Sequence, residues 1–436
     1  IGFTNHPIPI LSEKDDSIIY EMHIRDFTID ESSGVINDLR GTYLGTVEEN
    51  TIYKNPYNGK CVKTGIEHLC ELGITHVHLM PIFDFGSVDE RFPGSNNRNW
   101  GYDPKNFNVP EGSYCSNPYN PVTRILELRQ MIMKFHERGI RVVMDMVYNH
   151  MMSTVNMDNI VPGYYFRSDY LGRYTNGSGC GNELASERPM VRKFIIDSCL
   201  HWIKDYKIDG IRFDLMELLD IDTTKEIVKK TTKLDKNFLI YGEPWKGGSS
   251  PLVNGTYKGS QKNENFSIFN DTFRDAIRGN NHPSSGFING NQYSSICNWS
   301  IIEGLKGSIY TITSNPNESI NYVDAHDNYT LWDQVEKSQN QSIKFGEFRF
   351  NIPDYPLNSN LVKQDLLGMA IIFTAQGIPF IQSGSEWLQK LIARRTVLKD
   401  APEYAAKCTV LPSVPDWPFS APPTTFMLRS SMMILA

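Results

Sequence analysis

One phrase recurs along the chain: a helix-like stretch, then glycine and isoleucine, then an apolar run with the character of a β-strand. The junctions are Gly73-Ile74, Gly139-Ile140, Gly210-Ile211 and Gly377-Ile378. Glycine readily takes the left-handed conformation that ends a helix, so the next strand can begin at once. Repeated helix–strand units require parallel strands joined by crossover helices, which predicts an α/β fold.

Strand-like runs and long loops suggest how these units are arranged. Amphipathic helices are predicted over 62–72, 122–138 and 187–206. Strands are predicted over 17–25, 76–83, 141–148, 210–215, 238–243, 266–269, 319–325 and 378–383. Such a set fits a (β/α)8 TIM barrel with long βα loops, and an open doubly wound sheet is the structural alternative. The loops 84–120 and 151–187 follow strands, which is where a barrel builds its active site.

Composition restricts the partners more than the fold. The 436 residues carry 43 Lys and Arg against 50 Asp and Glu, a formal charge of −7. There is no basic run and no apolar run of about 18 residues, so we expect neither nucleic acid nor membrane as a partner. The seven scattered cysteines form no C-x-x-C pair, which predicts free thiols and disfavours a thiolate metal site. Free thiols also favour a cytoplasmic location.

Polar residues gather where the predicted strands end. Because side chains alternate along a strand, Arg212 and Asp214 share one face, and Ile211 and Phe213 the other. One aspartate at a strand end commonly caps a helix, but many charged strand ends on one side of a barrel predict an active site. His78, inside a strand, is a weaker candidate. The strand-end residues are Asp145, Asn149, His150, Arg212, Asp214, Glu243, Trp245, Asp324, His326 and Asp327.

Two of these carboxylates are separated by about one βα unit of chain. The ends of neighbouring strands should therefore bring Asp214 and Glu243 within reach of one substrate atom. Paired carboxyl groups are the machinery of glycoside hydrolysis, and their separation decides between retention and inversion of the anomeric centre. The sequence leaves that separation open.

Four segments resemble the signature regions of glycoside hydrolase family 13, the α-amylase superfamily: 145–150, 210–215, 241–245 and 322–327. Asn99-Trp-Gly-Tyr-Asp-Pro104 resembles a motif of type I pullulanases, the α-1,6 debranching enzymes of that family. The stretches 106–114 and 179–188 look similar to the same group. The resemblance runs from about residue 10 to about residue 387. It implies a (β/α)8 barrel, a retaining mechanism and an α-glucan substrate, with no required cofactor.

The resemblance also implies roles for matching residues. Asp214 would be the nucleophile, and Glu243 the general acid/base, whose pKa must lie above that of a free glutamate. Asp327 would stabilise the distorted sugar in the transition state. The remaining implied roles are a forked contact from Arg212 to Asp214; sugar binding by His150, His326, Trp100, Asp103 and Trp245; stacking of Tyr102 on the sugar; support of His150 and Arg212 by Asp145; and support by Asn149.

The chain departs from the family pattern at three places. Arg98 stands where the pullulanase motif begins with tyrosine, and Glu217 follows the second region, close to the nucleophile. Residues 388–436 match no family sequence that we recognise, and a non-native origin is our hypothesis for them. We therefore expect a leader or linker over 1–16, a catalytic barrel over 17–387 and an unassigned tail over 388–436, with the family's flanking domains missing at both ends.

The leading functional hypothesis is hydrolysis of α-1,6 branch linkages in pullulan, amylopectin or limit dextrins by a monomer. An α-1,4-acting amylase or neopullulanase is a rival with the same chemistry, and the segment 99–104 argues against it. A non-catalytic glucan-binding protein or an inactive fragment is a rival of another class. We commit to no metal: acidic and amide side chains in 151–187 could bind Ca²⁺, but no dense ligand spacing appears.

Overall fold

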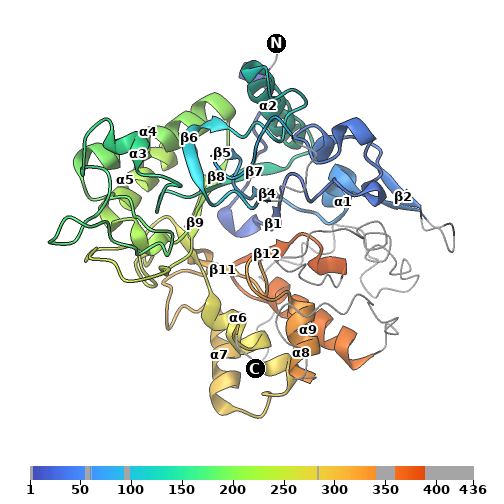
Figure 1. Ribbon diagram of the computed structural model, residues 1–436. Coiled ribbons are helices and arrows are strands. Elements are labelled where there is room, and N and C mark those ends of the chain that lie inside the picture. The colour runs from blue at the N-terminus through green and yellow to red at the C-terminus, as the bar shows by residue number, and fades with distance from the viewer. Residues whose placement is uncertain are drawn as a thin grey trace.

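The computed structural model describes residues 3–54, 59, 61–92, 99–281, 284–339 and 359–387. Parallel strands form a closed barrel in the order β1-β12-β11-β10-β9-β8-β7-β4, around which the helices are arranged (Figure 1). The barrel strands are β1 (Ile19–Met22), β4 (His76–Leu79), β7 (Arg141–Met146), β8 (Gly210–Phe213), β9 (Leu239–Gly242), β10 (Ser267–Phe269), β11 (Ser319–Asn321) and β12 (Ile378–Gln382). The closed ring confirms the (β/α)8 barrel and excludes the open sheet.

All eight predicted strands are present, and each is shorter than its apolar run. The run 17–25, for example, contributes only Ile19–Met22 to the ladder. Beyond Met22 the chain enters turns and leaves the ladder that β1 forms with β4 and β12. Hydrophobicity therefore marks where a strand lies, while the neighbouring strands decide where it ends.

The alternation of side chains divides each strand between two cores. Ile211 and Phe213 of β8 join the core between barrel and helices, as predicted. Tyr241 and Phe380 belong instead to a core inside the barrel, where bulky side chains fill the lumen. Arg212 lies on the inward face and is buried, so its charge must be compensated within the barrel.

The helices differ from prediction mainly at one start. Residues 61–63 are not helical; they form β3 (Cys61–Lys63), which pairs antiparallel with β2 (Ile52–Lys54), so the helix predicted over 62–72 begins only at Gly65. The other two predicted helices begin with Pro121 and Pro189, at the first position, where no amide hydrogen is needed. The helices are α1 (Gly65–Glu71), α2 (Pro121–Glu137), α3 (Val155–Asp158), α4 (Pro189–Tyr206), α5 (Ile221–Thr232), α6 (Asp271–Arg278), α7 (Ser295–Leu305), α8 (Leu331–Gln339) and α9 (Asn360–Thr374).

A second, smaller core lies between α6, α7, α8 and α9, which gather at the lower side of the molecule in Figure 1. Phe273, Ile301, Val335 and Ile372 pack together there. The antiparallel pair β5 (Phe83–Phe85) and β6 (Pro104–Pro110) lies within the predicted long loop 84–120 and gives it a fixed course. In the part of the chain that the structure describes, no helix is long and apolar enough to cross a membrane.

The segment before β1 packs on the amino-terminal end of the barrel. Lys207 Nζ donates to the carbonyl oxygens of Thr4 and His6, at 2.8 and 3.0 Å. His6 Nε2 lies 2.7 Å from His136 Nδ1, and His136 Nε2 lies 2.8 Å from a carboxylate oxygen of Asp209. The division into a leader (1–16), a barrel (17–387) and a tail stays a prediction, and 388–436 lies outside the described residues.

Candidate active site

Arg212 lies at the carboxyl end of the barrel and touches three carboxylates. Its Nη1 donates to Asp145 Oδ1 at 2.8 Å and to Asp214 Oδ1 at 3.0 Å, while Nη2 lies 2.7 Å from Glu243 Oε1. The predicted contact from Arg212 to Asp214 is present, but it is not forked, because the guanidinium is divided among three partners. The division holds the two candidate catalytic carboxylates on opposite nitrogens of one planar group.

Asn149 fixes the second oxygen of Asp214. Its Nδ2 donates to Asp214 Oδ2 at 2.7 Å and to the Asp214 carbonyl at 3.0 Å. Asn149 Oδ1 lies 2.5 Å from His150 Nδ1, so Asn149 orients both neighbours. Asp145 therefore contacts Arg212, while the ring of His150 contacts Asn149, and the supporting role of Asp145 stays a prediction.

Leu215, directly after Asp214, links it to Glu243 through the backbone. Leu215 has φ 42° and ψ 53°, in the left-handed region where a side chain is strained by about 1–2 kcal/mol. This turn brings its N–H to Glu243 Oε2 at 3.1 Å. The left-handed conformation of Leu215 therefore places a backbone N–H where it positions the carboxylate of Glu243.

Glu243 and Asp145, which both contact Arg212, differ in the direction in which their pKa values are shifted. Burial raises the pKa of Glu243 to about 7; Arg212 opposes this effect, and the negative charge of Asp214 adds to it. For Asp145, burial would raise the pKa, but Arg212 and His78 together outweigh it and lower the pKa to about 2. Glu243 can thus carry a proton near neutral pH, beside Asp145, which Arg212 helps to keep ionised. A carboxyl group that is protonated near neutral pH is what general acid catalysis needs.

His326 is enclosed by groups from several strands and loops. The ring of Tyr102 stacks on it with centroids 5.1 Å apart and planes 18° apart, and Trp100 meets it edge-on at 5.0 Å. The Tyr102 hydroxyl donates to Asp145 Oδ2 at 2.8 Å. The structure therefore brings Trp100, Tyr102 and His326 together beside the charged centre, as the resemblance implied.

Sequence reasoning missed Glu21 on β1, whose carboxylate contacts the ring and the backbone of His326, both at 2.7 Å. It also underrated His78, whose Nε2 lies 3.2 Å from Asp145 Oδ2. Both side chains are buried. A signal for Glu21 existed: it is an acidic residue within the apolar run 18–22, on the face that points into the barrel.

Other candidates lie at the margin of this centre. Asp327 is exposed, and its two oxygens accept from the backbone N–H and side chain of Asn328, at 3.0 and 3.1 Å. Asp103 accepts from Asn99 Nδ2 at 2.8 Å and so braces its own loop. Trp245 is half-buried against the core inside the barrel. Asp327 is thus exposed, whereas the side chains of Asp214 and Glu243 are each only 14% exposed, and all three catalytic roles stay predictions.

Two residues near the site, Glu217 and Arg98, depart from the family pattern, and the structure describes only Glu217. Glu217 forms an ion pair with Lys246 at 2.8 Å, in which the carboxylate is 24% exposed. It is therefore compensated at the surface, in line with the expectation of a loop charge. Arg98 lies outside the described residues.

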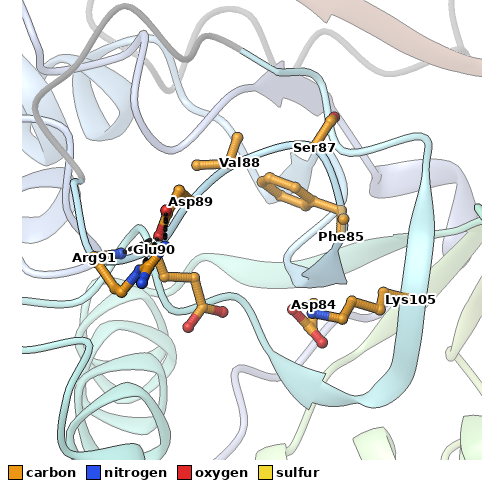
Figure 2. A pocket seen from close by; sticks show the side chains of 9 residues that line it. Asp84, Phe85, Ser87, Val88, Asp89, Glu90, Arg91 and Lys105 are labelled. Atoms are coloured by element: carbon orange, nitrogen blue, oxygen red, sulfur yellow. Dashed lines mark hydrogen bonds and ion pairs between the residues drawn. The ribbon is translucent and has the colours of Figure 1, made fainter.

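Three acidic side chains outside this centre, Asp84, Glu90 and Glu111, have carboxylate oxygens within 4.8 Å of one another. Figure 2 shows the first two in a pocket along 84–91, with Lys105 extending toward Asp84. Burial raises the pKa of Glu111 to about 7, which weakens it as a cation ligand. Each already has a protein donor: Asn106 for Asp84, Arg124 for Glu90, and the N–H groups of Phe85 and Ser113 for Glu111. We assign no metal to this cluster.

Comparisons with known proteins point to one family. Residues 60–161 match the family described as the α-amylase catalytic domain. The chain is 40% identical to the pullulanase of Bacillus subtilis (strain 168) over 395 residues, which cover 88% of this chain and 51% of that protein. It is 32% identical to pullulanase A of Streptococcus pneumoniae serotype 4 over 408 residues, or 86% of this chain and 28% of the relative.

Solved structures lead to the same group. The pullulanase from Bacillus acidopullulyticus superposes with a TM-score of 0.80 at 42% identity, covering 89% of this chain and 45% of that one. The pullulanase from Paenibacillus barengoltzii, in complex with maltohexaose and α-cyclodextrin, gives a TM-score of 0.80 at 39% identity, covering 89% and 59%. The chain thus spans about half the length of these relatives, or less.

Proposed function

We propose that the chain is a glycoside hydrolase of the α-amylase family and that it hydrolyses α-1,6-glucosidic branch linkages with retention, a proposal supported by its similarity to pullulanases. The observation that carries this proposal is the pairing of Asp214 and Glu243 on one guanidinium, with the pKa of Glu243 raised to about 7. A nucleophile and a protonated acid side by side are what a retaining glycosidase requires.

In the first step, Asp214 attacks the anomeric carbon while Glu243 protonates the oxygen of the leaving chain. Arg212 and Asn149 each hold one oxygen of Asp214, so the carboxylate is oriented for attack. The product of this step is a glycosyl ester on Asp214 and a free sugar hydroxyl.

In the second step, Glu243 takes a proton from water, which attacks the ester and releases the second product. Formation of the ester removes the negative charge of Asp214. Because that charge helps to raise the pKa of Glu243, the pKa falls when the ester forms. Glu243 therefore becomes a base at the point in the cycle where a base is needed.

The surrounding side chains suit a neutral sugar. Tyr102 and Trp100 offer aromatic surface for the apolar face of a ring, and His150 and His326 offer polar atoms for hydroxyl groups. We propose that Asp327, exposed at the mouth of this centre, completes the binding of the distorted sugar when substrate enters.

The test is release of maltotriose from pullulan by the purified chain, with amylose as the second substrate. We expect maltotriose from pullulan and no shortening of amylose, and Asp214→Asn supplies the blank. Cleavage of amylose would support the α-1,4-acting rival instead. Equal rates for the chain and for Asp214→Asn would favour the rival hypothesis of a non-catalytic glucan-binding protein or an inactive fragment.

Two further properties are proposals. We propose that the chain acts as a monomer, to be tested by its mass in light scattering. We also propose a cytoplasmic location, supported by six cysteines that are free among the described residues. Cell fractionation tests the location, and enrichment of the protein in the medium would contradict it.

A further inference from the structure

Glu21 devotes both carboxylate oxygens to one residue. Oε1 lies 2.7 Å from the ring Nδ1 of His326, and Oε2 accepts from the His326 backbone N–H at 2.7 Å. Glu21 is 2% exposed and lies on β1, whereas His326 follows β11 at a sequence distance of 305 residues. The carboxylate therefore fixes both the start of this loop and the ring that it carries.

These two contacts determine what the ring can offer to a ligand. Because Glu21 accepts at Nδ1, that nitrogen carries a hydrogen, and Nε2 is the ring nitrogen left for a sugar hydroxyl. Stacking on Tyr102 and the edge contact with Trp100 restrict rotation of the ring. The two contacts of Glu21 and the two aromatic contacts together fix one orientation of the imidazole.

The charges around the ring come from several strands. Burial favours the neutral imidazole, but the nearby carboxylate of Glu21 outweighs it, so the pKa of His326 is raised. From β7, Asp145 acts in the same direction as Glu21, and from β8, Arg212 acts against it. His78 on β4 lies 4.0 Å from Glu21 Oε1, and Glu243, directly after β9, also interacts electrostatically with His326.

We propose that Glu21 is a positioning residue for the reaction: it holds His326 as an imidazolium whose Nε2–H donates to a hydroxyl of the sugar being cleaved. The inference rests on the proposed function for its substrate, an α-glucan. Glu21 itself touches no substrate and acts only through His326.

The experiment follows His326 by NMR, using ¹³Cε1-labelled histidine, in the full chain and in Glu21→Gln. Loss of one signal in His326→Gln assigns the resonance. Glutamine keeps the shape but has one acceptor oxygen for two donors, so we expect the pKa of His326 to fall by about one unit. The alkaline limb of kcat/KM on pullulan should shift down with it, with kcat affected more than KM.

Glu386→Gln is the matched control. Glu386 Oε1 also contacts a histidine, His68 Nε2 at 3.0 Å, and accepts from the hydroxyl of Tyr20, which belongs to the core outside the barrel. The control changes the same chemical group next to β1 and should leave the titration of His326 unaltered. Glu21→Asp, which keeps the charge, should restore most of the pKa of His326.

Three results would overturn the proposal. They are an unchanged pKa of His326 in Glu21→Gln, a pKa shift of the same size in Glu386→Gln, or a pKa in Glu21→Asp that is no higher than in Glu21→Gln. If Glu21→Gln does not fold, Glu21→Asp and the titration of the unsubstituted chain carry the test, and a His326 pKa below 6.5 contradicts it. If the titration behaves as expected but pullulan is not cleaved, the proposed function fails while the positioning of His326 stands.

Discussion

The two ends of the barrel both carry a histidine–carboxylate network, yet the pKa of the histidine is shifted in opposite directions at the two ends. At the carboxyl end, Glu21 contacts His326 directly, and the pKa of His326 is raised. At the amino end, His6 contacts Asp209 only through His136. The pKa of His6 is lowered by burial, and the neighbouring His136 and Lys207 act in the same direction.

The difference teaches that residue types alone do not distinguish an active end from a structural one. Both networks contain buried aspartate and histidine side chains. At the carboxyl end a buried cation, Arg212, is shared among three carboxylates, and burial nevertheless leaves one of them, Glu243, with a raised pKa. The amino end joins the segment before β1 to the barrel. Four substitutions test this contrast, in order of decreasing effect.

Asp214→Asn should remove hydrolysis almost completely, because the amide is no nucleophile and the covalent step is lost. We expect a fall in kcat of at least about 10⁴-fold. Asp209→Asn, at the amino end, should leave kcat per folded molecule within about twofold. Initial rates of maltotriose release from pullulan measure both, and a comparable loss in the two variants would contradict the contrast.

Arg212→Met should destabilise the fold, since it leaves the buried Asp145 and the half-buried Asp214 and Glu243 without their shared cation. Removing one partner of a buried ion pair costs about 3–5 kcal/mol in the free energy of unfolding. Arg138→Met is the matched control, because Arg138 also contacts two carboxylates but is 35% exposed. The control should cost less than about 1 kcal/mol. Urea unfolding at pH 7 measures both.

Glu243→Gln should alter how stability depends on pH. The pKa of Glu243 is about 7 in the folded chain against 4.5 for a free side chain, so the folded state binds the extra proton between these values. Its contribution to stability is therefore present below about pH 4.5 and is lost as the pH rises through about 7. Melting temperatures from pH 4.5 to 8 should decline less in the variant than in the unsubstituted chain.

His6→Asn should have the smallest effect, about 1 kcal/mol for one part-buried hydrogen bond, and none on kcat. Because the folded pKa of His6 lies below 6.5, its contribution is present above that pH and is lost as the pH falls through the folded pKa. The protection of residues 3–16 against amide hydrogen exchange, corrected for the intrinsic pH dependence of exchange, should therefore fall toward pH 5 in the unsubstituted chain. A dependence of equal size in His6→Asn would show that other groups cause it.

The fold was predictable because its signals are local. The junctions at Gly73 and Gly139 end helices as expected, whereas α4 ends at the left-handed Lys207 and Gly210 already belongs to β8. The alternation around Arg212 assigned the inward face correctly. The partition of Arg212 among three carboxylates was not predictable, since it depends on how the closed ring aligns β7, β8 and β9. The contact of Glu21 with His326 joins segments 305 residues apart, and only closure between β1 and β12 brings them together.

Leu215 shows how stability engineering could damage this protein. A left-handed residue other than glycine is a common target for replacement by glycine or asparagine, since either relieves backbone strain. Here the strained turn aims an N–H at Glu243, the proposed proton donor. A library selected for heat resistance alone would therefore favour substitutions at Leu215 that loosen the link between the two reacting carboxylates, and it should be screened for turnover at the same time.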